Sequence, residues 1–86
     1  MTYGVYSFRD NKTSFGQIWY DRSDDAAKRG FSVMIGNDVM MRQFSSDFDL
    51  FKIAEFDSET GQIDPVWPIE YLCNGNAVIM EKDYEK

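Results

Sequence analysis

The sequence predicts an α+β domain: an antiparallel sheet in the order β-β-α-β-β with one helix packed on a face. Two observations predict this fold. Segments rich in aromatic and β-branched residues occur in two pairs, and each pair is joined by a short polar stretch, which is typical of hairpins. Between the pairs lies one segment whose apolar residues recur at helical spacing. A chain of 86 residues that is 43% hydrophobic suits one domain with a core.

The first two strands are expected at residues 3–8 and 15–20, with a polar turn over residues 9–14. Tyr, Val, Phe, Ile and Trp dominate both segments, and these residue types favour a pleated, half-buried surface. Gly16 is expected to mark a bulge or the close approach of another group. The two strands therefore predict an antiparallel hairpin.

The helix is expected to begin after Ser23, whose hydroxyl can accept hydrogen bonds from free N–H groups of the first turn. The two aspartates that follow suit the positive end of the helix dipole. Five apolar residues form a stripe at 3.6-residue spacing: Ala26, Ala27, Phe31, Met34 and Ile35. The Gly-Asn pair at 36–37 is expected to end the helix. Residues 38–44 fit either a helical turn or an ordered loop.

The segment 48–56 predicts a central strand, because both of its faces carry apolar residues. The alternation puts four residues on one face and two on the other: Phe48, Leu50, Ala54 and Phe56 against Phe51 and Ile53. Residues 57–61 predict a tight turn in which Gly61 has a positive φ.

The returning strand is expected at residues 62–67. Pro65 lacks an N–H, so this strand should lie at a sheet edge or contain a bulge, and Pro68 is expected to end it. Residues 77–80 predict a short final strand. We therefore expect one domain over residues 1–80 and a charged, flexible tail over residues 81–86.

The composition excludes several classes of active site. The chain has no histidine and one cysteine, Cys73, which excludes His-based catalytic triads, the common zinc patterns and an intrachain disulfide. No phosphate loop, dinucleotide fingerprint or EF-hand is present. We therefore expect a protein that is not an enzyme and needs no cofactor or metal.

No apolar run approaches the roughly 18 residues of a membrane span. The N-terminus lacks the basic and apolar regions of a signal peptide. We expect an intracellular protein with no membrane partner.

The charge of −6 is divided unevenly along the chain. Residues 1–43 carry a net +1, whereas residues 44–86 carry a net −7. Because affinity for nucleic acid comes largely from neutralised phosphates, only the N-terminal half could present a phosphate-binding surface. The acidic half would repel DNA or face a basic partner.

The block from residue 46 to 66, SDFDLFKIAEFDSETGQIDPV, resembles the small nonstructural protein of gokushoviruses, which are Microviridae. Nine positions carry the resemblance: Asp47, Phe48, Leu50, Phe51, Ile53, Phe56, Asp57, Thr60 and Gly61. Ala54 stands where that pattern has glycine. The Val-Tyr-Ser strand, the Phe-Gly step and the Ala-rich helix are similar too, so the resemblance covers roughly residues 3–66. It implies a phage nonstructural accessory protein of genome replication, acting in the host cytoplasm and described as DNA-binding.

Single-stranded DNA is the leading candidate ligand. Its binding needs exposed rings that stack on bases, with cations nearby for phosphates. The N-terminal hairpin and helix offer three rings and five cations for this role: Tyr6, Phe8, Trp19, Arg9, Lys12, Arg22, Lys28 and Arg29. The alternative is that these rings belong to the core and that the arginine and lysine side chains are solvated, because small sheets need aromatic cores.

Two further hypotheses concern protein partners. An interaction module could recruit or inhibit a replication or host protein through its acidic half and a sheet edge. Trp67, beside Pro65 and Pro68, could either anchor a protein contact or pack over the sheet edge. A homo-oligomer joined through edge strands is the third possibility. The methionines at 40–41 could form an adaptable contact surface or fill the core.

Overall fold

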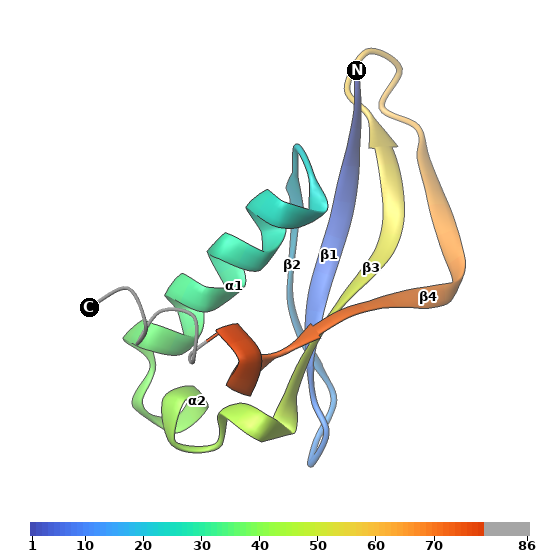
Figure 1. Cartoon of the computed structure of the whole chain (residues 1–86). Coiled ribbons are helices and arrows are strands. Elements are labelled where there is room, and N and C mark those ends of the chain that lie inside the picture. Colours follow the sequence, from blue (N-terminus) through green and yellow to red (C-terminus); the bar gives the residue numbers. More distant parts are fainter. Residues whose placement is uncertain (79–86) are drawn as a thin grey trace.

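The computed structural model describes residues 1–78 and contains one four-stranded sheet with helices on one side (Figure 1). The elements follow the chain in this order: β1 (Thr2–Asp10), β2 (Phe15–Asp21), α1 (Asp24–Asn37), α2 (Val39–Gln43), a 3-10 turn (Ser45–Asp47), β3 (Phe48–Asp57) and β4 (Ile63–Asn74). The predicted α+β class and the β-β-α-β-β order are confirmed, and residues 38–44 take the helical option.

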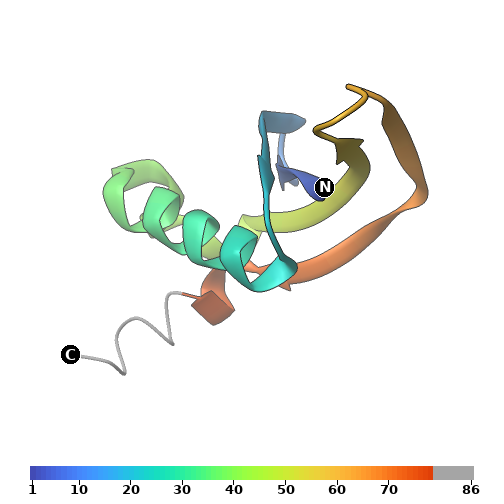
Figure 2. The same cartoon turned by 90° about the horizontal axis from the view of Figure 1, so that it is seen from above.

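The strands lie in the order β2-β1-β3-β4, and every neighbouring pair is antiparallel. Strand β3 therefore occupies a central position and β4 an edge, as predicted. Gly61 in the β3–β4 turn has a φ of 79°, as expected for a glycine at this point of a hairpin. Figure 2, which looks down on the molecule, shows a strongly curved sheet with α1 to one side.

Helix α1 begins where the sequence predicts. The hydroxyl of Ser23 accepts a hydrogen bond from the N–H of Ala26 at 3.1 Å, so it caps the first turn. The helix lays its apolar stripe on one face of the sheet and builds the core there. The buried residues of this core come from the sheet, from both helices and from the last described residue: Tyr6, Ala27, Phe31, Ile35, Met41, Phe48, Leu50 and Val78.

A bulge in β3 corrects the predicted division of its faces. Val5 of β1 pairs with Ala54, but the next residue of β1 pairs with Lys52, so Ile53 is the extra residue. From the bulge onward the alternation is shifted. Phe56 consequently contacts the ring of Tyr20 on the side away from α1, instead of sharing the core face with Leu50.

Strand β4 is longer and more irregular than predicted. Pro68 does not end it, because pairing with β3 resumes at Glu70 and continues to Asn74. Residues 66–69 have no partner in β3, and the ribbon of β4 bends sharply there (Figure 1). The Trp67–Pro68 peptide bond within this segment is cis.

The expected final strand at residues 77–80 is wrong for the part that the structure describes. Gly75 to Val78 form a helical turn, and Val78 packs into the core. A Cβ at Gly75 would meet the carbonyl oxygen of Ser45 at 2.5 Å, so the chain passes too close to the 3-10 turn for a larger residue. Residues 79–80 and the predicted tail over 81–86 lie outside the described residues.

Candidate binding surface on the open face of the sheet

The face of the sheet turned away from α1 carries a second set of apolar side chains. We call it the open face, and its large residues come from all four strands: Tyr3, Phe15, Ile18, Tyr20, Phe51, Ile53, Phe56, Ile63, Trp67, Ile69 and Tyr71. Six of them are among the exposed large hydrophobic residues. Each of these six residues is 42–83% exposed. Together they expose an area on the order of 600 Å², which is at the upper end of the range for the largest apolar patch on a monomer.

Rings on this face contact one another across the strands. Near the β1–β2 turn, the ring of Phe51 lies between Phe15, at 5.7 Å between centroids, and Tyr71, at 5.8 Å. At the other end, Tyr20 lies between Tyr3, at 5.2 Å, and Phe56, at 5.7 Å. These separations are typical of favourable aromatic pairs, so the rings within each cluster support one another.

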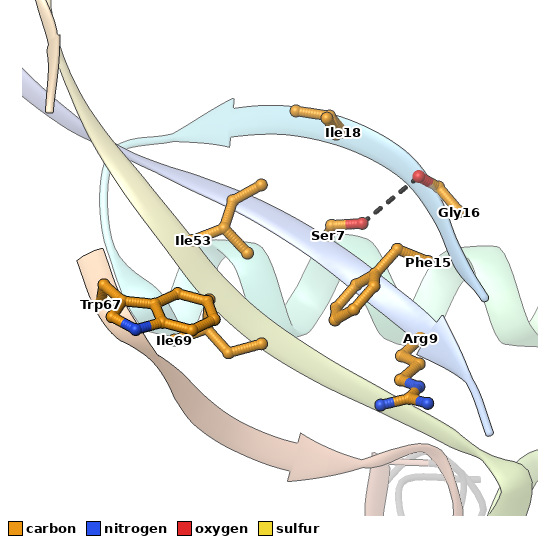
Figure 3. Close-up of a pocket in the computed structure, with 8 residues that line it drawn as sticks. All are labelled: Ser7, Arg9, Phe15, Gly16, Ile18, Ile53, Trp67 and Ile69. Atoms are coloured by element: carbon orange, nitrogen blue, oxygen red, sulfur yellow. Dashed lines mark hydrogen bonds between the residues drawn. The ribbon is translucent and has the colours of Figure 1, made fainter. Parts of the chain in front are cut away.

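A groove of about 380 Å³ lies between the two ring clusters. Figure 3 shows its apolar wall, formed by Phe15 and Ile18 from β2, Ile53 from β3, and Trp67 and Ile69 from β4. Ser7 is on the floor, where its hydroxyl donates to the carbonyl oxygen of Gly16 at 3.3 Å.

The two bulges shape this groove. Ile53, the extra residue of the β3 bulge, faces the groove, and the unpaired segment 66–69 of β4 carries Trp67 and Ile69 to its side. Trp67 is 83% exposed, so most of the indole faces solvent. A large apolar ring in that position is available for contact with a ligand.

Charged groups sit at one end of the open face. The guanidinium of Arg9 lies over the ring of Phe15, 5.7 Å from its centroid. Asp49 is the register partner of Arg9 on β3, and it accepts hydrogen bonds from the side-chain amides of Asn11 at 2.7 Å and Asn74 at 2.8 Å. Desolvation, followed by the charge of Asp49, raises the pKa of Tyr71. This end of the groove is therefore polar, with a cation and an anion at its border.

The three rings predicted to stack on bases lie on the other side of the sheet, under α1. Tyr6 is 1% exposed, and its hydroxyl donates to Asp24 at 2.7 Å. Burial, followed by this hydrogen bond, raises the pKa of Tyr6 well above its usual range. The ring of Phe8 stacks on Phe31, and Trp19 lies against Tyr6 and the core. These rings are core residues, which was the alternative interpretation.

The predicted cations do not gather beside exposed rings. Within residues 1–78, Arg9 alone lies over a ring of the open face. Lys12 is in the β1–β2 turn and Arg22 is in the connection to α1, at opposite ends of the hairpin. Lys28 and Arg29 belong to α1, which covers the other face of the sheet.

The sequence contains a signal for the open face that lies in the balance of apolar residues and not in single residues. Apolar residues occupy both faces of the strands, yet one helix of 14 residues can cover only one face. The surplus apolar residues must then be exposed or covered by another molecule.

Within residues 1–78, no helix is long and apolar enough to span a membrane, and no cluster of His, Cys, Asp or Glu could hold a metal ion.

Fold and surface together define a small α+β domain whose sheet has one face covered by α1 and one aromatic face exposed. Comparison with known families identifies the chain further. It belongs to the family described as Phage ORF5 protein, whose family model matches residues 3–78. The chain is therefore a bacteriophage protein. No curated protein and no solved structure matches it.

Proposed function

We propose that this chain is a non-catalytic phage accessory protein that acts in the host cytoplasm by binding a protein partner on its open face. The observation that carries the proposal is the groove between two clusters of exposed rings. Aromatic residues are enriched in the cores of protein interfaces, where they fill pockets and exclude water. Trp67, which combines the largest exposure with a position beside the groove, is the expected anchor.

The charge distribution favours a protein partner over a polyanion. The open face borders one arginine among residues 1–78, and residues 44–86, which include β3 and β4, carry a net −7. A surface of this kind suits an apolar segment flanked by basic residues, because opposite charges at the rim speed association and fix orientation. The partner would be a phage replication protein or a host protein.

Affinity capture from infected host lysate tests the proposal. Wild type is compared with Trp67→Ser, which removes the anchor, and with Val39→Ser, an equally conspicuous exposed apolar residue on α2. We expect one protein to be retained by wild type and Val39→Ser and lost with Trp67→Ser. Direct binding is then measured with the purified partner by tryptophan fluorescence, because burial of Trp67 shifts its emission to the blue. Equal capture by all three proteins would contradict the assignment of the open face.

A second candidate function is binding of single-stranded DNA during viral genome replication, as the resemblance to gokushovirus nonstructural proteins implies. One observation favours it: Phe15, with Arg9 over its ring, and Tyr71 are exposed beside the same groove, and base stacking on such rings contributes about 1–3 kcal/mol per base. Because Tyr6, Phe8 and Trp19 belong to the core, this function would use rings of the open face in their place.

Titration of a labelled oligonucleotide at several salt concentrations separates the two functions. If Arg9 and the turn residue Lys12 both contacted phosphates, DNA binding would weaken with salt at a slope of about −1.4 in a log–log plot. Arg9→Gln should halve that slope, whereas Arg42→Gln on α2 should leave it unchanged. Absence of binding at low salt would reject this function and leave the protein partner.

A further inference from the structure

Strand β2 leaves one edge of the sheet unpaired. Among residues 1–78 its only strand neighbour is β1, so the N–H and C=O groups on its outer side have no strand partner. Five of its seven residues are exposed, and only Trp19 and Asp21 are partly covered. An exposed edge of this length is a template for another strand.

The opposite edge is protected by the devices that natural sheets use. Strand β4 contains Pro65 and Pro68, which cannot donate to a ladder, and its residues 66–69 leave the register of the sheet. Asp64 and Glu70 add charge along it. An incoming strand would meet a bend, two missing donors and two carboxylates.

Strand β2 has no proline and keeps a single irregularity, an extra residue at Gly16–Gln17 opposite Phe8, where the sequence predicts a bulge. Residues 15–20 read FGQIWY and contain no proline and no charge; the first charged residue is Asp21 at the end of the strand. In a chain of net charge −6, six consecutive neutral residues at a sheet edge are a place where two copies can meet without opposing like charges. Most carboxylates belong to residues 44–86, whose strand β4 lies at the far edge.

We propose that β2 pairs antiparallel with β2 of a second copy of this chain, about a two-fold axis near Ile18, the middle residue of the strand. The axis places Gly16 opposite Tyr20, Gln17 opposite Trp19 and Ile18 opposite itself. Phe15 faces Asp21, so no two like charges meet along the edge. A ladder over seven residues contains roughly six hydrogen bonds. Ile18 and Tyr20, which are 63% and 60% exposed, gain cross-strand neighbours on the open face.

This pairing goes beyond the proposed function because it changes the binding surface. Phe15, Gly16 and Ile18 of β2 form one side of the groove. Joined at β2, two four-stranded sheets become one sheet of eight strands, and the grooves of the two copies lie on either side of the axis. The second copy thus contributes Ile18 to the border of the first copy's groove, and the dimer presents two grooves to one partner.

Light scattering coupled to size-exclusion chromatography, over a range of concentrations, tests the pairing on the full chain. We expect wild type to reach twice the 10.0 kDa chain mass. Gln17→Lys places one lysine from each copy near the axis, the device that blocks natural edges, and should raise the dimer dissociation constant at least 10-fold. Gln43→Lys adds the same charge on α2 and should leave the constant unchanged.

Hydrogen exchange gives a readout that does not depend on a substitution. The outward amides of residues 15–21 should become more protected as wild type is concentrated, while exchange of the β1–β2 turn amides, which are bonded within the chain, should not change with concentration. A monomer at several hundred micromolar, or a dimer whose β2 amides stay unprotected, would overturn the proposal. So would a dimer that survives Gln17→Lys but is lost with Trp67→Ser, since the copies would then meet through the open face.

Discussion

Removal of one hydroxyl, by Tyr6→Phe, should cost this protein a substantial part of its stability. The Tyr6 ring is buried between the sheet and α1, and its hydroxyl reaches out of the core to Asp24 at 2.7 Å. Asp24 is the first residue of α1, so this hydrogen bond joins the first strand to the beginning of the helix. The phenylalanine variant keeps the ring and loses only that link.

The magnitude follows from the charge and exposure of the acceptor. Hydrogen bonds to charged groups contribute about 1.5–3 kcal/mol, and Asp24 is only half-buried, so water can take the place of the hydroxyl in the variant. We therefore expect a loss near the lower end, about 1.5 kcal/mol. In a domain of this size that loss lowers Tm by roughly 6–12 °C.

Urea unfolding followed by circular dichroism measures the loss, and Tyr20→Phe is the matched control, since Tyr20 is 60% exposed. The raised pKa of Tyr6 adds a pH test. In the unfolded chain a tyrosine ionises near pH 10, whereas in the folded protein Tyr6 stays protonated to higher pH. Stability from this group is complete below about pH 10 and falls as the pH rises further, because the unfolded state then loses the proton first. If Tyr6→Phe costs no more than Tyr20→Phe, and wild type loses no more stability than the variant above pH 10, the proposed link is refuted.

Three further predictions test the core, the glycines and the β3–β4 turn. Leu50→Ala empties a fully buried site and should cost about 3 kcal/mol in urea unfolding, whereas Ile63→Ala on the open face should cost less than about 0.5 kcal/mol. Gly30→Ala should stabilise by about 0.5–1 kcal/mol, because its Cβ has an ordinary 3.9 Å contact, while Gly75→Ala should lower Tm because its Cβ meets backbone at 2.5 Å. A hydrogen bond from the backbone N–H of Glu59 lowers the pKa of Asp57. The ionised carboxylate therefore stabilises the fold above about pH 4, and this stabilisation is lost as the pH falls through the lowered pKa. Asp57→Asn should flatten the acid limb of a plot of stability against pH.

Local signals in the sequence were sufficient for the order of elements. Ser23 is a strong helix cap, the polar turns separate the strands, and Pro65 excludes β4 from the interior of the sheet. Each of these features acts through the backbone of a few neighbouring residues. They could therefore be predicted without knowledge of the rest of the fold.

The faces of the strands could not be predicted as well. Strict alternation assigns Phe56 and Leu50 to one face, but the extra residue Ile53 reverses the assignment beyond it. The bulge depends on pairing with β1, more than 40 residues away in the chain, so no local pattern reveals it. For the same reason Tyr6 and Trp19 could be placed on a strand but not assigned to the covered side of the sheet.

The two prolines of β4 have a consequence for how large an assembly can become. A sheet that accepts strands at both edges adds copies without end, as fibres do. Here the two prolines hinder pairing at the β4 edge, and pairing of two copies through β2 would occupy the other edge. If β2 pairs as proposed, association along the sheet would stop at a pair and would not continue into a fibre.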